Sequence, residues 1–488
     1  MKTETCDFVV IGSGAGGATA ALILAEAGRE VVLLEEGPEV RDQDRGQGTN
    51  EAFMRLFRER GTQVAMGRSV IPVLQGRCVG GTTVVNGAIV WRMPEDAYAR
   101  IFGAIGARDA IPLRALEARF DRIEKDLSVA ATPDGLLGEN GRLMRAGAEK
   151  LGWRGHAIRR NVVDCKGSSR CLEACPTKRK QSMENTYIPR AVALGARLRA
   201  DHAVETIEVR GGRAMAVMGR RADGVHFRVE PRRGVVLAAS TIQSPILLRN
   251  SGIGDRAHVG RHFRVHPGTA VSGVYRDPVR IWIGGTQTYE IDHFRDEGFK
   301  MEVTSLPLEL AGVRMHGFGD VFQKKVADFP HTAVWGVQVR SDAEGTVAPG
   351  RFGARIAFTP SERDMTLIRR GVKSLAALHF AAGAIRVYPG VHGGPEVLTS
   401  RDEVDALDEL SIDPQSYSMI ASHLFGTCRM NADPREGVVD LDFAVHGVKA
   451  LWIVDASIFP TTPGVNPQHS IMALAMLAAE KIADAPPA

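Results

Sequence analysis

The feature that most constrains this chain is a glycine fingerprint, Gly12-x-Gly14-x-x-Gly17, placed directly after an apolar run that ends at Ile11. The run predicts a buried parallel strand, segment 18–28 predicts a helix closed by a glycine, and segment 30–37 predicts a second strand. In such a β-α-β unit the three glycines permit a tight turn, close approach of phosphate, and close packing of helix on strand. The N-terminus of this helix favours a bound pyrophosphate.

An acidic residue at the end of the second strand narrows the choice of nucleotide. Glu35 stands 18 residues after Gly17, where a carboxylate accepts hydrogen bonds from ribose hydroxyls and repels a 2′-phosphate. This disfavours NADP and leaves NAD and FAD as alternatives.

Composition excludes several classes of protein. The chain has 488 residues, a formal net charge of +4, 44% hydrophobic and 24% charged residues. This composition is typical of globular proteins, and the length predicts about three domains, or two with long insertions. So small a charge, without a basic block, argues against a nucleic-acid partner. We find no apolar run of about 18 residues and no secretory signal before the first strand, so we expect no transmembrane segment and a cytoplasmic location.

A second glycine-rich segment, "GRCVGGTTVVNG" (76–87), offers further backbone without side chains. Gly80 and Gly81 carry no Cβ, so the chain there can lie flat against a ring system or a pyrophosphate. Thr82 and Asn86 add polar groups. Taken alone, this segment is equally well explained as a structural turn.

The last seventy residues contain two more candidate site segments. "SHLFGTCRM" (422–430) places His423 before a Gly-Thr turn, and "LWIVDAS" (451–457) predicts a strand that ends at Asp455. Asn466 at a cap position and Pro467 at the first helical position then predict a final helix, whose N-terminus we expect to face a cofactor.

These ordered motifs resemble the glucose–methanol–choline (GMC) oxidoreductases over nearly the full length of the chain. The matching segments are the fingerprint, "GRCVGGTTVVNG", "VVLAASTIQSPILLRNSGIG" (235–254), "VGRHFRVHP" (259–267), "SHLFGTCRM" and the final "VDAS…NPQ" segment. The resemblance implies FAD, bound non-covalently or covalently. It also implies an α/β fold: a discontinuous Rossmann-like FAD-binding domain (1–100, 200–270 and 420–488), a helical cap with a cysteine loop (101–199), and an α+β substrate domain with an antiparallel sheet (271–419).

The resemblance also assigns roles to single residues. His423 and Asn466 match the pair beside the reactive edge of the flavin. The cofactor-binding positions that it implies are Gly12, Gly14, Ala15, Gly17, Glu35, Gly80, Gly81, Thr82, Asn86, Val204, Asp455, Ala456, Asn466 and Pro467. We interpret His262, His266 and His469 as supporting residues.

The implied reaction is oxidation of an alcohol to an aldehyde or ketone by hydride transfer to flavin N5. Neutral imidazole accepts protons near neutral pH, so His423 is the candidate general base, while Asn466 orients the hydroxyl group. A cyanohydrin-cleaving FAD lyase (hydroxynitrile lyase) is an alternative from another class, because the same base serves it.

Substrate and electron acceptor are less constrained by the sequence. The apolar segment 299–322 and the resemblance to shorter, cysteine-bearing members of the family favour a lipophilic or aromatic alcohol, with a sugar or other polyol as the alternative. A quinone, cytochrome or similar carrier is favoured over O₂, which makes the enzyme a dehydrogenase rather than an oxidase.

A cysteine loop remains outside this scheme. Cys165, Cys171 and Cys175 have the spacing C-x5-C-x3-C and lie among basic residues, which suits thiolates and an iron–sulfur cluster. The first gap is long and no fourth cysteine is near, so the sequence favours a plain loop with free thiols and leaves the cluster as the alternative.

Overall fold

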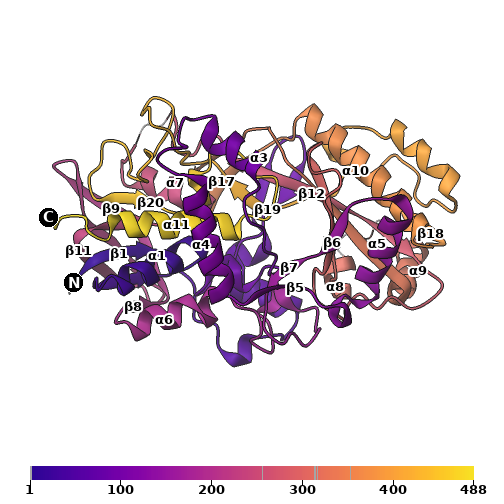
Figure 1. The fold of residues 1–488 in the computed structure, drawn as a ribbon, viewed down its shortest axis with the longest axis horizontal. Helices are drawn as coiled ribbons and strands as arrows, with labels where there is room; N and C mark the ends of the chain where they lie inside the picture. The colour runs from indigo at the N-terminus through magenta and orange to yellow at the C-terminus, as the bar shows by residue number, and fades with distance from the viewer. Residues whose placement is uncertain (1–2, 255–256, 313–314, 316, 352, 488) are drawn as a thin grey trace.

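The computed structural model describes residues 3–254, 257–312, 315, 317–351 and 353–487. Two β-sheets lie at opposite ends of an elongated molecule, and both chain termini lie at the end formed by the first sheet (Figure 1). The first sheet has the strand order β8-β2-β1-β11-β10-β9, with β20 also paired to β11. Its strands are β1 (Thr3–Ile11), β2 (Val31–Leu34), β8 (Arg197–Arg199), β9 (His202–Arg210), β10 (Arg213–Arg221), β11 (His226–Leu237) and β20 (Leu451–Ile453).

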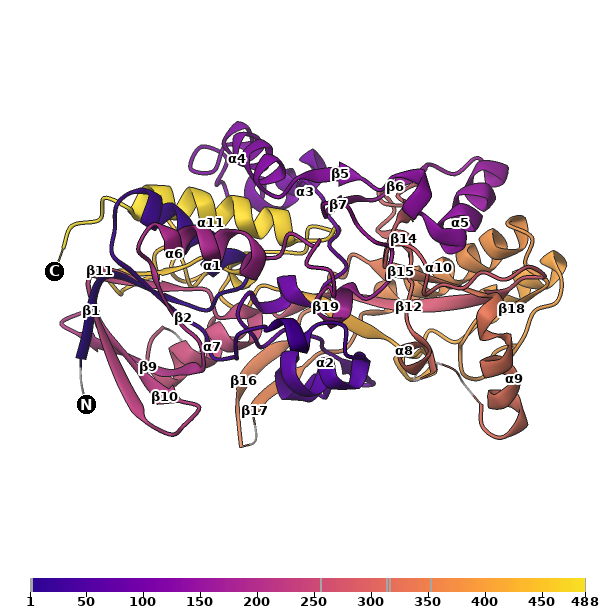
Figure 2. The ribbon, with the colours of Figure 1, turned by 90° about the horizontal axis from the view of Figure 1, so that it is seen from below.

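The first sheet is parallel where it carries the nucleotide fingerprint. β1 pairs in parallel with β2 and with β11, and β11 pairs in parallel with β20 from the far end of the chain. Helices cover its faces (Figure 2): α1 (Ala15–Glu26), α6 (Tyr187–Ala193) and α7 (Ser240–Asn250). Helix α11 (Gln468–Ile482) packs against α1, and α4 (Leu113–Asp126) packs against α11 on the side away from the sheet. The predicted β-α-β unit is therefore confirmed, and Gly28 has a φ of +73°, as a helix-terminating glycine requires.

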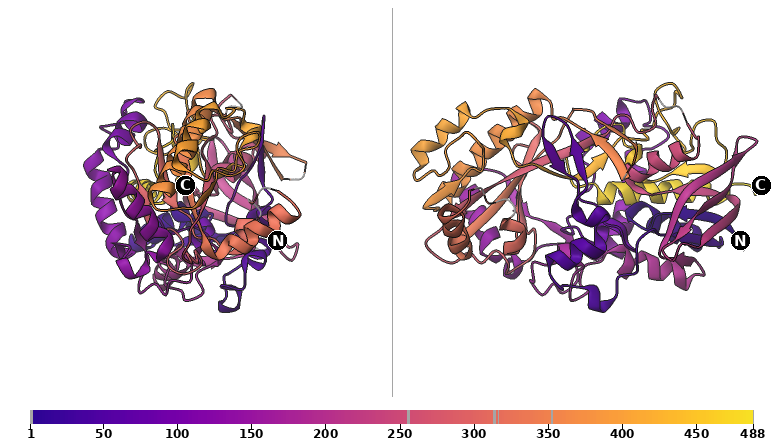
Figure 3. Two further views of the ribbon diagram at one scale, coloured as in Figure 1. Left: turned by 90° about the vertical axis from the view of Figure 1, so that its right-hand side faces the viewer. Right: turned by 180° about the vertical axis from the view of Figure 1, so that it is seen from behind.

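The second sheet is antiparallel and has the order β18-β12-β15-β14-β13-β6, with β19 also paired to β12. Its strands are β6 (Gly155–Ala157), β12 (Arg264–Val274), β13 (Tyr289–Ile291), β14 (Phe299–Val303), β15 (Thr332–Val339), β18 (Arg386–Tyr388) and β19 (Ile420–Phe425). The helices packed at this end include α5 (Gly138–Leu151) and α10 (Glu362–Ala381), as the view from behind also shows (Figure 3).

Smaller elements connect these two layers. The short helices are α2 (Thr49–Leu56), α3 (Glu95–Tyr98), α8 (Leu308–Gly312) and α9 (Asp320–Asp328). A small sheet has the order β16-β17-β3-β4, and β5 pairs with β7. These strands are β3 (Val64–Met66), β4 (Val70–Pro72), β5 (Val129–Ala131), β7 (Arg159–Asn161), β16 (Thr346–Gly350) and β17 (Gly353–Ala357).

Two local predictions are wrong. Segment 354–360 falls within the predicted substrate domain (271–419) and its antiparallel sheet, but β17 pairs with β16 and β3 in the small sheet. Asn466 was expected to cap the last helix, but Pro467 is the capping residue of α11, because the Asn466 side chain is engaged by Lys300 instead. The mixed α/β fold class itself is confirmed, whereas the exact domain boundaries stay a prediction.

The described residues contain no helix that is both long and apolar enough to cross a lipid bilayer.

Candidate active site

One cavity of about 910 Å³ joins the nucleotide fingerprint to the His423–Asn466 pair. The two ends of the chain meet here, because β1 and α1 supply one wall and the segments around β19, β20 and α11 supply another. The predicted residues that line it are Gly12, Gly14, Ala15, Glu35, Gly81, Thr82, Asn86, Val204, His423, Asp455, Ala456, Asn466 and Pro467. Gly17 and Gly80 do not line it.

The glycines of the fingerprint have different tasks in the structure. A Cβ on Gly17 would lie 1.8 Å from the carbonyl oxygen of Gly12, so this position serves close packing of α1 on β1. A Cβ on Gly14 would meet no atom of the described residues within 4 Å. Gly14 therefore opens onto the space where the fingerprint expects a pyrophosphate, next to helix N–H groups that no side chain caps.

Ser13, which the sequence analysis missed, connects the two glycine-rich segments. Its backbone N–H and its hydroxyl donate to Glu35 Oε2 at 3.0 and 2.6 Å, and Gly80 N–H donates to the Ser13 hydroxyl oxygen at 2.9 Å. Gly80 thus holds the loop in place, and Glu35 is oriented at the end of β2. These residues suit an adenosine dinucleotide with free ribose hydroxyls, so the cradle fits FAD.

Asp455 lies beside the fingerprint, where a Cβ on Gly16 would be 3.5 Å from its Cα. Its Oδ2 accepts from the backbone N–H of Ser240 at 3.0 Å and from the hydroxyl of Ser244, while its Oδ1 accepts from Ser457 N–H. Burial raises the pKa of Asp455 against these hydrogen bonds. Asp455 therefore fastens the start of α7 to the end of β20, and it positions the backbone around Ala456 at the cavity wall.

His423 and Asn466 are brought together from β19 and from the residue pair before α11. The distance from His423 Nε2 to Asn466 Nδ2 is 3.5 Å. His423 keeps some accessible surface because its ring faces the cavity, whereas Asn466 is buried. Burial and the nearby Lys300 cation lower the pKa of His423 to about 3, so the imidazole is neutral over the whole physiological range.

A second histidine controls where the His423 proton lies. Gly464 N–H donates to His266 Nε2 at 3.1 Å, and His266 Nδ1 lies 3.2 Å from His423 Nδ1. In this arrangement His266 carries its proton on Nδ1 and donates it to His423, which leaves the His423 proton on Nε2. His423 Nε2 is free to accept a proton only in the other pair of tautomers, in which His423 carries its proton on Nδ1 and His266 carries its own on Nε2, and this pair gives up the hydrogen bond from Gly464 N–H. His266 is thus the residue that selects between donor and acceptor states.

Lys300 lies behind Asn466, and sequence reasoning missed it. Its ammonium donates to Asn466 Oδ1 at 2.6 Å and to Glu290 Oε2 at 2.8 Å, and it also pairs with Glu302. Because Oδ1 is occupied, the Asn466 amide presents its N–H₂ group toward His423. The sequence does contain a signal for Lys300. In "FKMEV" (299–303), two charged residues occupy alternate positions of a strand whose other residues are apolar.

The cysteine loop does not gather its thiols. Cys165, Cys171 and Cys175 are free, and the described residues bring no group of three or more His, Cys, Asp or Glu together as a metal site. The iron–sulfur alternative therefore has no support in the structure. Burial alone would raise the pKa of Cys171, but the Arg160 and Lys180 cations lower it, and the Arg160 guanidinium lies 3.1 Å from its sulfur.

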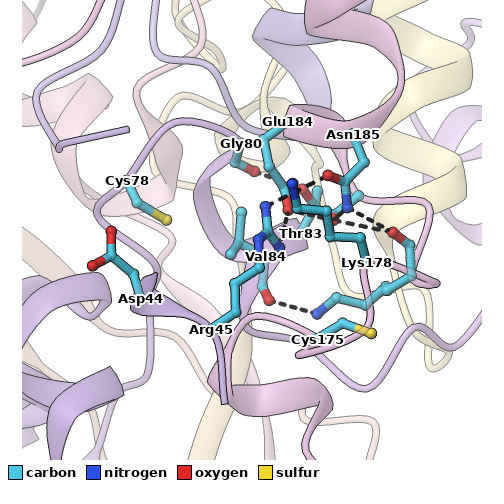
Figure 4. A network of polar contacts seen from close by, with 12 residues as sticks. Asp44, Arg45, Cys78, Gly80, Thr83, Val84, Cys175, Lys178, Glu184 and Asn185 are labelled. Carbon is cyan, nitrogen blue, oxygen red and sulfur yellow. Dashed lines mark hydrogen bonds and ion pairs between the residues drawn. The ribbon is translucent and has the colours of Figure 1, made fainter. Parts of the chain in front are cut away.

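The other polar groups of this region form a separate network. Buried Arg45 and Glu184 are 3.3 Å apart, and Figure 4 shows Cys78 and Cys175 on opposite sides of Arg45 in that view. Lys180 Nζ donates to the carbonyls of Val84 and Asn86 at 2.6 and 3.0 Å. Through Lys180, this region therefore holds the second glycine-rich segment in position.

Comparison with known proteins decides the family. The family model described as GMC oxidoreductase matches residues 7–268 and, in its C-terminal part, residues 336–475. The chain belongs to the GMC oxidoreductases. A GMC-type oxidoreductase of Mycobacterium tuberculosis, named as uncharacterized, is 35% identical over 97% of this chain and 75% of its own length.

Other GMC oxidoreductases are more distant. A long-chain-alcohol oxidase of Arabidopsis thaliana is 25% identical over 98% of this chain and 67% of its own length. Among solved structures, the formate oxidase of Aspergillus oryzae, studied for its FAD modification, has a TM-score of 0.74 at 15% identity and covers 99% of this chain and 98% of its own. The family resemblance is confirmed, and the family is one of FAD-binding oxidoreductases.

Proposed function

We propose that this GMC oxidoreductase is an FAD-dependent enzyme that oxidises an alcohol to an aldehyde or ketone at the His423–Asn466 pair. The single observation that carries the proposal is that one cavity contains both this pair and a cradle that fits FAD. When bound, FAD supplies the two-electron acceptor, taking hydride from the carbon at its N5 atom.

The chain's own residues bind the hydroxyl group and remove its proton. The Asn466 N–H₂ group, held by Lys300, donates to the alcohol oxygen and orients it. His423 Nε2 takes the hydroxyl proton when His266 accepts from His423 Nδ1. The predicted cofactor-binding residues that line the same cavity, from Gly12 to Pro467, hold the nucleotide, while Gly17 and Gly80 support the fingerprint turn and the second glycine-rich segment from outside it.

A lipophilic alcohol is the substrate that we propose. The apolar segment 299–322 divides in the structure. Phe299, Met301 and Val303 are in the core, whereas Leu306 and Leu310 line the cavity. Residues 313, 314 and 316 lie outside the described residues. Leu172 and Ile89 add further apolar surface to the cavity wall, and the Arabidopsis relative is named for a long-chain alcohol.

Our proposal for the electron acceptor is supported by the sequence analysis alone. A quinone or cytochrome-type carrier remains our proposal, although the Arabidopsis relative is named an oxidase, so the comparison lends the dehydrogenase preference no support. Anaerobic reduction of the enzyme by substrate, followed by mixing with air or with a quinone analogue, measures both routes. Fast reoxidation by air would contradict the preference.

The test of function is flavin reduction without oxygen. Decanol, a benzylic alcohol, a sterol, glucose and a cyanohydrin are mixed separately with the yellow enzyme. We expect decanol or the benzylic alcohol to bleach the flavin, and His423→Ala to slow this by about 10²-fold or more, the usual scale for a positioned base. Glucose reacting best would overturn the lipophilic substrate. Cyanohydrin turnover with oxidised flavin would identify the lyase.

A further inference from the structure

A row of ionisable side chains crosses three adjacent strands of the second sheet. His156 on β6 pairs in register with Glu290 on β13, and Glu290 pairs in register with Glu302 on β14. The next residue of the row, on β15, is Gly336. Because in-register residues share one face of a sheet, the three side chains form a line. The line ends at Glu302, because its neighbour Gly336 has no side chain. Glu302 and Gly336 both line the cavity.

Hydrogen bonds and ion pairs connect this row continuously. His156 Nε2 lies 3.1 Å from Glu290 Oε1, and Glu290 Oε2 accepts from Lys300 Nζ at 2.8 Å. Lys300 in turn pairs with Glu302. The side chains of Glu290 and Lys300 are 1% exposed, whereas that of His156 is 43% exposed. The chain of contacts therefore runs from solvent to the cavity.

The charges of these side chains allow the row to bind one additional proton. With Glu290 and Glu302 ionised and Lys300 charged, the buried group carries one net negative charge. Burial raises the pKa of Glu302 against the influence of Lys300, whereas Lys300 and His156 overcome burial and lower the pKa of Glu290. The hydrogen bond to Glu290 raises the pKa of His156. The additional proton thus has two favoured positions, one at each end.

The groups packed around the row are also defined. Asp292 lies 3.9 Å from His156 Nδ1 and is itself paired with Arg154. Trp91 donates to Glu290 Oε2 at 3.0 Å, and Gln287 donates to Glu302 Oε2 at 2.8 Å. His266 and His423 face Lys300 from β12 and β19, and the Lys300 charge lowers the pKa of each.

We propose that Glu302, Lys300, Glu290 and His156 form the path by which the proton of the alcohol leaves the cavity for solvent. This rests on the proposed function. The proposed reaction transfers a hydride, that is one hydrogen nucleus with two electrons, from the carbon to FAD. It also releases the hydroxyl proton. His423, with a pKa of about 3, does not retain that proton. Glu302 takes it up through the cavity that both side chains line.

Transfer along the path is balanced at each bond. Lys300 gives one N–H proton to ionised Glu290 and takes the proton of neutral Glu302, so its charge before and after is the same. Glu290 receives this proton on Oε2, its carboxyl group rotates so that the protonated oxygen faces His156, and the proton passes to His156 Nε2. His156 then releases a proton to water from its exposed ring. No oxidant or further reactant is needed beyond the FAD reaction itself.

The kinetic test separates electron transfer from proton release. In anaerobic stopped-flow experiments a pH indicator follows the proton while flavin absorbance follows the electrons. We compare wild type with His156→Gln, which keeps a hydrogen-bonding group beside Glu290 but cannot carry the proton. The control is Trp91→Phe, which removes a hydrogen bond to Glu290 but no ionisable group.

In wild type and Trp91→Phe we expect proton release in step with flavin reduction. In His156→Gln we expect release to lag by about 10²-fold, the scale lost with a positioned proton-transfer group, and added imidazole to restore it. Release in step with flavin reduction in His156→Gln would overturn the proposal.

A second test needs no substrate. Infrared difference spectra between acid and neutral pH on the FAD-bound protein report protonated buried carboxyl groups. We expect a carboxylic-acid band that is absent in Glu302→Gln and that shifts its midpoint in His156→Gln. A band unchanged in both variants would overturn the path even if alcohols reduce the flavin. If no alcohol reduces the flavin but the band behaves as expected, the proposed function fails while the proton-sharing row stands.

Discussion

The Nδ1 atoms of His266 and His423 face each other at 3.2 Å, and Gly464 N–H holds the opposite nitrogen of His266. A proton shared between two neutral rings lies on one of them at a time, so the tautomer of His423 depends on a residue that does not line the cavity. The base strength of this site is therefore set by a partner on β12.

Replacing His266 tests this dependence. His266→Leu removes the acceptor for His423 Nδ1–H, and we expect flavin reduction to slow by about 10²-fold with FAD content unchanged. His266→Gln, whose amide oxygen can accept that proton, should retain more of the rate. Equal rates in the two variants would show that the tautomer is not controlled from β12.

Alanine substitutions at two glycines of the fingerprint should affect different properties, FAD binding at one position and stability at the other. Gly14→Ala adds a methyl group into open space, so the protein should fold normally but lose FAD during purification. Gly17→Ala places a methyl group against the Gly12 carbonyl, and we expect a loss of stability of about 1–3 kcal/mol, as for other overpacked sites. The ratio of flavin to protein and the thermal midpoint of each variant measure these effects. A stable, fully yellow Gly14→Ala would contradict the proposed pyrophosphate position.

Lys300 should be required for stability in a pH-dependent way. Lys300→Met leaves Glu290 and Glu302 buried without their cation, which costs about 3–5 kcal/mol for a pair broken on one side. Lys300 contributes to the lowered pKa of Glu290, so in the variant this carboxyl takes a proton more easily and the loss should shrink as the pH falls. Urea unfolding of wild type and variant at neutral and acid pH measures it. Lys300→Met combined with Glu290→Gln is the control, and a loss that grows toward acid pH would contradict this account.

Buried neutral histidines should make the protein sensitive to acid. Burial lowers the pKa of His469 to about 4, and neither of its ring nitrogens has a hydrogen-bond partner among the described residues. Its folded pKa is below the unfolded value of about 6.5, so its contribution is present above that value and is lost as the pH falls toward the folded pKa. His469→Phe, which keeps a ring stacked near Phe120, should remove about 2 kcal/mol of the loss between pH 7 and 5. The measurement is urea unfolding at both pH values, and an unchanged loss would contradict the prediction.

Local pattern was enough to predict the β-α-β unit that forms one wall of the cavity, whereas the binding role of its single residues stays a prediction. Glycine spacing, strand length and the acidic residue Glu35 are encoded within one β-α-β unit, so the sequence determined them. Ser13, between two fingerprint glycines, had no pattern of its own, because its role arises from contact with Gly80, which is distant along the chain.

The chemical half of the site was predicted less completely. His423 and Asn466 were expected from the family resemblance, and the structure places them 3.5 Å apart, but their catalytic roles remain proposals. The cap prediction for Asn466 was wrong, because helix rules consider only neighbouring residues, whereas Lys300 reaches Asn466 from another sheet. The row from His156 to Glu302 depends on strand register, which a single sequence does not reveal.

The order of the site-forming segments along the chain should determine when this protein can use its nucleotide during synthesis. β20 enters the first sheet beside β11, and Asn466 completes the pair with His423, so a growing chain presents its fingerprint long before it has the residues that use the bound nucleotide. A ribosome-stalled chain that ends before residue 451 would lack a strand of the sheet and half of the chemical site. Flavin acquisition should therefore be a late event, near release from the ribosome, and prematurely terminated chains should be colourless.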